Sequence, residues 1–117
     1  MEPQFTALSE LRRFSLAEGV SAQALFGVGA MLNLVELAPD ALVPAHSHPH
    51  EQLGVVLSGE LNLVVAGHEH LLGEMDAYAL PGELEHQAKA GPRGALVLDV
   101  FQPVREDYRE AAGSAAS

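Results

Sequence analysis

The sequence contains no cysteine among its 117 residues. This absence excludes disulfide bonds, thiolate metal ligands and cysteine nucleophiles. It also suits a reducing compartment, and we expect the protein to be cytoplasmic. Any metal ion must therefore be held by histidine, carboxylate or amide side chains.

Basic residues are scarce, because six Lys and Arg stand against 16 Asp and Glu and give a formal net charge of −10. An acidic surface repels phosphate backbones and anionic lipid head groups, so we expect no nucleic acid partner and no membrane partner. No apolar run approaches the about 20 residues of a membrane span, and the N-terminus lacks the basic start of a signal peptide. The sequence predicts a soluble protein without a targeting segment.

The composition, with 48% hydrophobic and 19% charged residues, is that of an ordinary globular domain rather than a disordered chain. The length allows a single domain, which we place at residues 1–110. Within it, the polar residues 1–10 are expected to form an N-terminal arm or an edge strand, and residues 103–110 a short helical turn. Residues 111–117 (AAGSAAS) have too little bulk to pack and are expected to be a disordered tail.

Short apolar segments separated by Gly, Pro and Asp recur at the spacing of an all-β sandwich or barrel. Ser58-Gly59 and residues 66–69 predict tight turns in a meander, and Gly91-Pro92 predicts a further break. The expected strands are residues 12–16, 22–26, 30–37, 53–57, 60–65, 70–72, 78–80, 86–90 and 95–101.

The segment 44–59, PAHSHPHEQLGVVLSG, carries the clearest chemical signal. His46 and His48 are two residues apart, so on an extended strand both imidazoles leave the same face, which Gln52 shares. Neutral imidazoles are good ligands for divalent metal ions. The pattern indicates a metal site, and the alternative is a histidine-rich exposed loop.

This segment resembles the first motif of the cupin superfamily, which reads G, five residues, H-x-H, three or four residues, E, six residues, G. His46, His48 and Gly59 match its positions, Gln52 replaces the Glu, and Asp40 replaces the first Gly.

Residues 75–86 resemble the second cupin motif, which reads G, five residues, P-x-G, two residues, H. Pro81 and His86 remain in register, whereas Met75 and Glu83 replace the glycines. Asp tolerates left-handed backbone and Met does not, so the turn at Met75 departs most from the pattern. The resemblance implies an all-β fold, the cupin double-stranded β-helix or jelly-roll barrel. It also implies one divalent metal ion (Ni, Zn, Fe or Mn) held by His46, His48, Gln52 and His86.

The glutamine has an electrostatic consequence. Three neutral imidazoles and one amide leave the full +2 charge on the ion, whereas Glu would cancel one unit. We therefore expect a less tightly held ion that attracts anionic substrates and acts as a Lewis acid rather than as a redox centre.

The remaining histidines are expected to lie outside the metal site. Pro49 interrupts the strand before His50, so we expect His50 at the mouth of the pocket, with a surface position or direct ligation as the alternatives. His68 and His70 repeat the spacing of two but lie around a predicted turn at Gly67, so we expect them to be solvated.

The last predicted strand, ALVLDVF, holds one charged residue, Asp99, in an apolar run. A buried carboxylate needs a partner, and desolvation raises its pKa toward the range useful for acid–base catalysis. Arg105 follows within reach and can pair with a substrate carboxylate, or with Asp99 as a structural ion pair that closes the barrel.

Residues 97–108 together with residues 46–52 resemble a narrower group, the pectin-degradation cupins that convert 4,5-unsaturated uronates to linear keto acids. The resemblance implies substrate-pocket roles for Asp99, Phe101 and Arg105. We expect Asp99 and Arg105 to be catalytic, and Phe101, Arg105 and His50 to contact the substrate. The substrate is then a small anionic sugar from pectin or alginate.

Two other functions remain open at this stage. A metal-dependent dioxygenase would use the same ligands around Fe(II), but usually has a carboxylate where this chain has Gln52. A non-catalytic cupin would bind a sugar or effector without converting it. We also expect a homodimer, in which residues 1–10 add to the sheet of a neighbouring barrel.

Overall fold

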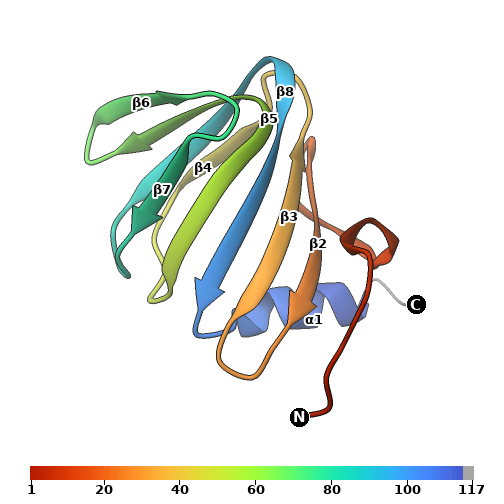
Figure 1. Ribbon diagram of the computed structural model, residues 1–117. Helices are drawn as coiled ribbons and strands as arrows, with labels where there is room; N and C mark the ends of the chain where they lie inside the picture. The colour runs from red at the N-terminus through yellow and green to blue at the C-terminus, as the bar shows by residue number, and fades with distance from the viewer. Residues whose placement is uncertain (115–117) are drawn as a thin grey trace.

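The structure is a computed structural model that describes residues 1–114. Strands dominate it, and one short 3-10 helix and one α-helix lie near the two ends of the chain (Figure 1). The elements are η1 Leu8–Glu10, β1 Arg13–Ala17, β2 Val20–Phe26, β3 Met31–Leu37, β4 Leu42–His46, β5 Glu51–Val65, β6 His68–Leu72, β7 Ala77–Leu80, β8 His86–Gln102 and α1 Glu106–Ser114. The predicted all-β class is confirmed.

β5 and β8 are long because each belongs to both halves of the fold. The first part of β5 pairs with the last part of β8, in a sheet that continues to β7 on one side and through β3 and β2 to β1 on the other. The last part of β5 pairs with the first part of β8, and β6 and β4 flank that pair. Residues of both halves line one interior cavity.

The breaks predicted at Ser58-Gly59 and Gly91-Pro92 are wrong, because β5 and β8 continue through them. The ladder instead shifts register on both sides of Ser58-Gly59, which bends the strands from one half into the other. Gly59 and Gly94 have φ of 79° and 77°, and a Cβ on Gly59 would overlap the Gly94 carbonyl oxygen. Glycine therefore permits a bend here rather than ending a strand.

Two strands differ from the sequence prediction. β4 was not expected, and it pairs with β8 so that His46 lies opposite His86. β6 begins at His68, so the turn consists of Ala66 and Gly67 and both His68 and His70 lie on the strand. Their side chains are exposed, as expected.

The two ends of the chain also differ from expectation. Disorder from residue 111 onward is wrong for residues 111–114, because α1 continues to Ser114 and Ala111 and Ala112 pack against the core. Residues 115–117 of the expected tail lie outside the described residues. Residues 1–7 precede η1 without forming an edge strand, and Phe5 is 94% exposed.

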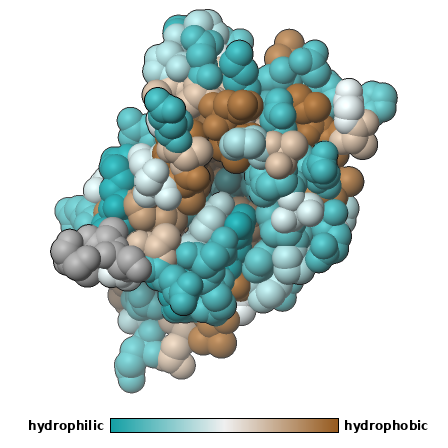
Figure 2. Space-filling model, turned by 180° about the vertical axis from the view of Figure 1, so that it is seen from behind, coloured by the Kyte–Doolittle hydropathy of each residue, from teal (hydrophilic) through white to brown (hydrophobic). Residues whose placement is uncertain are grey.

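The outer surface is mostly hydrophilic on the face seen in Figure 2, with apolar residues in smaller groups between. Among residues 1–114, no helix is long and apolar enough to cross a membrane.

Cross-strand rows organise the interior of the larger sheet. Asp99 on β8 lies opposite Asn33 on β3 and Gly54 on β5, and Gly54 lies opposite Tyr78 on β7. Directly opposite residues project from the same face, so this polar row points into the cavity. The next row on the same face lies two residues further along each strand and consists of Val56, Val97, Val35 and Ala22.

Candidate metal centre and its cavity

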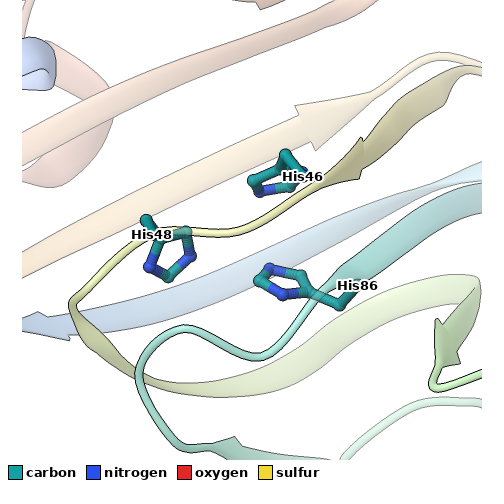
Figure 3. A group of neighbouring side chains, drawn as sticks. All are labelled: His46, His48 and His86. Atoms are coloured by element: carbon teal, nitrogen blue, oxygen red, sulfur yellow. The ribbon is translucent and has the colours of Figure 1, made fainter.

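Three histidines from different parts of the chain meet in one cluster, and two of them, His46 and His86, line the cavity. His46 ends β4, His86 begins β8, and His48 lies in the connection that follows β4. The ring centroids of His46 and His86 are 4.5 Å apart, and those of His48 and His86 are 5.1 Å apart. One ligand atom from each ring lies within 4.8 Å of the others, and the rings surround a common space (Figure 3). This cluster can hold a metal ion.

The backbone fixes how each imidazole presents its nitrogen atoms. In each ring Nδ1 is within hydrogen-bond distance of a carbonyl two residues away: His46 with Pro44 O at 2.8 Å, His48 with His50 O at 3.1 Å and His86 with Leu84 O at 2.9 Å. A carbonyl can only accept, so Nδ1 must carry the proton and Nε2 keeps its lone pair for a ligand bond. All three rings are therefore prepared as Nε2 ligands.

Gln52 supplies a further test of whether a cation fits. Its Oε1 lies 3.1 Å from Nε2 of His48, and both atoms are acceptors in the tautomer just derived. Two facing lone pairs repel unless a cation lies near both of them. Gln52 is buried with its side chain in the cavity lining, so the donor set of three imidazoles and one amide fits a divalent ion.

Burial also keeps two of the imidazoles, those of His48 and His86, neutral. Desolvation and then the positive charge of Arg105 lower the pKa of His48 to about 4. Burial likewise lowers the pKa of His86. Neutral imidazole is the form that binds metal, so both rings are ready to ligate at neutral pH.

The cavity behind the histidines has a volume of about 60 Å³ and is open to solvent. Its wall is apolar except for one group of side chains that can bind or titrate. These are Asn33, His46, Gln52, Tyr78, His86, Asp99, Arg105 and Tyr108.

Asp99 is buried in this wall, as predicted, but its partner is Tyr78. The Tyr78 hydroxyl donates to Asp99 Oδ1 at 2.5 Å. It can reach because Gly54 lies between them and a Cβ there would overlap both groups. Burial raises the pKa of Asp99 to about 6, although the hydrogen bonds from Tyr78 and Gln52 and the charge of Arg105 act in the opposite direction.

Arg105 pairs with Asp107 rather than with Asp99. Its Nη2 lies 2.8 Å from Asp107 Oδ2 and its Nε lies 3.2 Å from Oδ1. The guanidinium carbon is 5.1 Å from the ring centroid of Phe101 and 3.9 Å from that of Tyr108. Among residues 1–114 the buried Nη1 has no hydrogen-bond partner. The expected alternative of an Asp99–Arg105 ion pair is therefore wrong.

His50 is half-buried and lies next to the cluster without joining it. Its ring centroid is 5.4 Å from that of His48 and 6.4 Å from that of Phe101. It is not among the described residues that line the cavity, so its place at the mouth stays a prediction.

Sequence reasoning missed Asn33, Tyr78 and Tyr108. A signal for Asn33 exists, because it interrupts the apolar side of the strand MLNLVEL between Met31 and Val35. Nothing in the sequence alone indicates that Tyr78 reaches Asp99, because the contact depends on the pairing of three strands.

The turns that depart from the cupin glycines still have the glycine-like backbone. Asp40, Met75 and Glu83 have φ of 60°, 68° and 70°. The left-handed backbone expected to be tolerated at Asp40 is confirmed, and Met75 adopts it as well. The amide of Glu83 donates to the carbonyl of His48 at 2.7 Å, which ties this turn to the metal centre.

Comparison with known proteins agrees with this geometry. Residues 33–101 match the family described as the cupin domain. The pectin degradation protein KdgF of Dickeya dadantii is 29% identical over 79 residues, which are 67% of this chain and 72% of that protein. The solved structure of KdgF from Halomonas sp. matches with a TM-score of 0.84 and 26% identity, covering 92% of this chain and 99% of that one.

An RmlC-like cupin from Shewanella frigidimarina matches with the same TM-score of 0.84 and 27% identity, covering 92% of this chain and 96% of that one. The family match spans more than half of the sequence and includes all four predicted ligands together with Asp99 and Phe101. The chain therefore belongs to the cupin family, as a small single-domain member.

Proposed function

We propose that this cupin binds one divalent metal ion through His46, His48, Gln52 and His86 and converts a 4,5-unsaturated uronate to its linear keto acid. The main support is one cavity whose wall includes two histidines of the cluster, a buried carboxyl with a raised pKa (Asp99) and a buried guanidinium (Arg105). Similarity to the pectin degradation protein KdgF supports the substrate class.

The reaction is an isomerisation, so it needs no oxidant and consumes no water. The ring opens when the C1 hydroxyl loses its proton, C1 becomes a carbonyl carbon and the bond from C1 to the ring oxygen breaks. That oxygen then carries the negative charge of an enolate on C5, and C5 becomes a ketone when C4 gains one proton. When bound, a divalent ion supplies Lewis-acid stabilisation of negative charge on the substrate oxygens.

The protein side chains bind the substrate and move the proton. A carboxyl with a pKa of about 6 exchanges protons readily near neutral pH, so Asp99 accepts the proton of the C1 hydroxyl group and returns one to C4. Arg105 Nη1 donates to the substrate carboxylate, and Phe101 forms a wall against the sugar ring. His50, whose ring lies beside Phe101, contacts the substrate from the entrance.

The test is a turnover assay on metal-loaded protein with freshly prepared 4,5-unsaturated uronate, from which the spontaneous rearrangement is subtracted. We expect acceleration that is equal with and without oxygen and is lost on chelation. No acceleration by fully loaded protein would overturn the proposed reaction. A rise in melting temperature with the uronate but no turnover would favour a binding protein, and a need for oxygen would favour a dioxygenase.

We also propose that the protein forms a homodimer through its N-terminal residues. Phe5 and Met1 are 94% and 76% exposed, and residues 1–7 belong to no strand or helix. An arm with two exposed apolar side chains can pack on a second copy of the chain. Light scattering should give about twice 12.4 kDa for the full chain, and Phe5→Ser should weaken association. A particle of 12.4 kDa at micromolar concentration would exclude the dimer.

A further inference from the structure

Asn33 on β3 places an amide in the cavity wall that the proposed chemistry does not use. It is 1% exposed, and among residues 1–114 neither its Oδ1 nor its Nδ2 has a hydrogen-bond partner. A buried amide with both atoms unpaired is costly, and native proteins almost always pair such groups. We therefore expect a ligand that enters the cavity to form the missing hydrogen bonds with the Asn33 amide.

The register places this amide beside the proposed acid–base residue. Asn33 lies directly opposite Asp99, since β3 and β8 are neighbours in the sheet (Figure 1). Opposite residues of an antiparallel pair have their Cβ atoms about 4.5–5.5 Å apart on the same face. A ligand group bound to Asn33 is therefore held next to the carboxyl of Asp99.

A second unpaired donor lines the same cavity. Arg105 Nη1 is buried without a partner, while Nε and Nη2 are occupied by Asp107 and the guanidinium face lies on Tyr108. These contacts fix the guanidinium and leave the cationic Nη1 group, with its two N–H bonds, for a ligand. Asn33 and Arg105 thus offer one charged donor, one neutral donor and one neutral acceptor.

The type of each unpaired atom defines the ligand. A carboxylate only accepts, so it suits Arg105 Nη1 but would leave Asn33 Oδ1 unpaired. A hydroxyl group both donates and accepts hydrogen bonds. A ring hydroxyl and the hydroxyl next to it can therefore pair with both Oδ1 and Nδ2 of Asn33. An apolar ring would satisfy neither atom of the amide.

We propose that Asn33 is a specificity-determining residue that binds a ring hydroxyl group of the ligand, so that the cavity selects hydroxylated ring acids over acids with a bare ring. The inference rests on the proposed function for the identity of the ligand. It adds that hydroxyl binding at Asn33 orients the ring against Asp99, because the two side chains are opposite each other.

The test compares two probes on metal-loaded protein by calorimetry. D-galacturonate has a carboxylate and ring hydroxyls, whereas cyclohexanecarboxylate has a carboxylate on a six-membered ring without hydroxyls. We expect the wild-type protein to bind galacturonate more tightly. Asn33→Val should weaken galacturonate binding by about 10- to 100-fold and change cyclohexanecarboxylate binding less than about twofold.

Two further variants make the comparison interpretable. Asn33→Ala removes the amide without adding bulk and should reproduce the selective loss. Val35→Ala alters the next inward position of β3 and should leave the ratio of the two affinities unchanged. Equal losses for both probes, or no loss for galacturonate, would overturn the hydroxyl site.

The outcome is separable from that of the proposed reaction, because binding is measured without turnover. Selective loss in Asn33→Val with no uronate conversion by wild-type protein would keep the hydroxyl site and reject the reaction. Conversion by wild-type protein with an unchanged KM in Asn33→Val would keep the reaction and reject the role of Asn33.

Discussion

Two rows of side chains cross the same sheet two residues apart, and they have opposite chemistry. The deeper row, formed by Val56, Val97 and Val35, is apolar throughout and is at most 5% exposed. The row nearer the histidines contains Asp99 and Asn33, which are 7% and 1% exposed. Burial is therefore nearly the same in the two rows, and only the side-chain types differ.

The comparison distinguishes side chains that stabilise the fold, in the apolar row, from side chains that form the candidate site, in the polar row. Burial of the apolar row stabilises the folded state, and the row contains no side-chain polar atom that needs a hydrogen-bond partner. The polar row occupies equally buried positions at a cost in desolvation, and it leaves both amide atoms of Asn33 without a partner. Core positions given to costly polar groups are typical of sites that have been selected for function.

The largest expected effect concerns the metal centre. His86→Ala removes one of three rings that share a ligand space, so stoichiometric divalent metal binding should be abolished. Metal content after gel filtration, measured by elemental mass spectrometry, gives the stoichiometry. His68→Ala, on exposed β6, is the control and should retain the metal. Unchanged metal content in His86→Ala would exclude this cluster as the site.

The next effect separates the two rows directly. Asp99→Asn keeps the shape but removes the titratable group, so turnover should fall by about 10²–10⁴-fold while metal content and melting temperature persist.

Val97→Ala, in the apolar row, is its matched control. It should cost about 2 kcal/mol in the free energy of unfolding and leave turnover per folded molecule unchanged. If Asp99→Asn instead lost about 1–3 kcal/mol of stability at an unaltered rate, Asp99 would be structural.

A smaller loss of turnover is expected for a substitution at Gly54, which lies between Tyr78 and Asp99 in the polar row. The Cβ of Gly54→Ala would overlap the Tyr78 ring and Asp99 Oδ1, so the two side chains must move apart. Misplacing Asp99 should lower kcat by about 10²-fold, because proton transfer depends on close positioning. Tyr78→Phe separates the causes, since it removes the hydrogen bond without adding an atom to the cavity. A Gly54→Ala enzyme with normal kcat would show that the short Tyr78–Asp99 contact has no role in turnover.

The metal centre was accessible from the sequence because its residues fall in two spaced motifs. The spacing of His46 and His48 predicts that both lie on one strand, but β4 ends at His46 and His48 reaches the cluster from the following connection. The predicted set still meets, because pairing of β4 with β8 places His46 opposite His86.

Only part of the polar row could be predicted from the sequence. Asp99 stands out as a charge in an apolar run, whereas its neighbours Asn33 and Tyr78 are set by pairings between distant segments. The long strands were missed for a related reason. The glycines at residues 59 and 91 predict strand ends, whereas the close approach of Gly59 to Gly94 lets β5 and β8 bend and continue. Local sequence does not distinguish the two uses of glycine.

The smallest expected effect tests the turns that lead into the site. Met75 has φ of 68° with an exposed side chain, so little packing compensates for its left-handed backbone. Met75→Gly should therefore raise the free energy of unfolding by about 1 kcal/mol, since glycine removes about 1–2 kcal/mol of strain and returns part of it as chain entropy. Asp40→Gly is the matched control and should gain less, because Asp adopts this backbone at lower cost. Equal gains in urea unfolding would mean that residue type does not set the strain, and a loss in Met75→Gly would mean that the methionine side chain stabilises the turn.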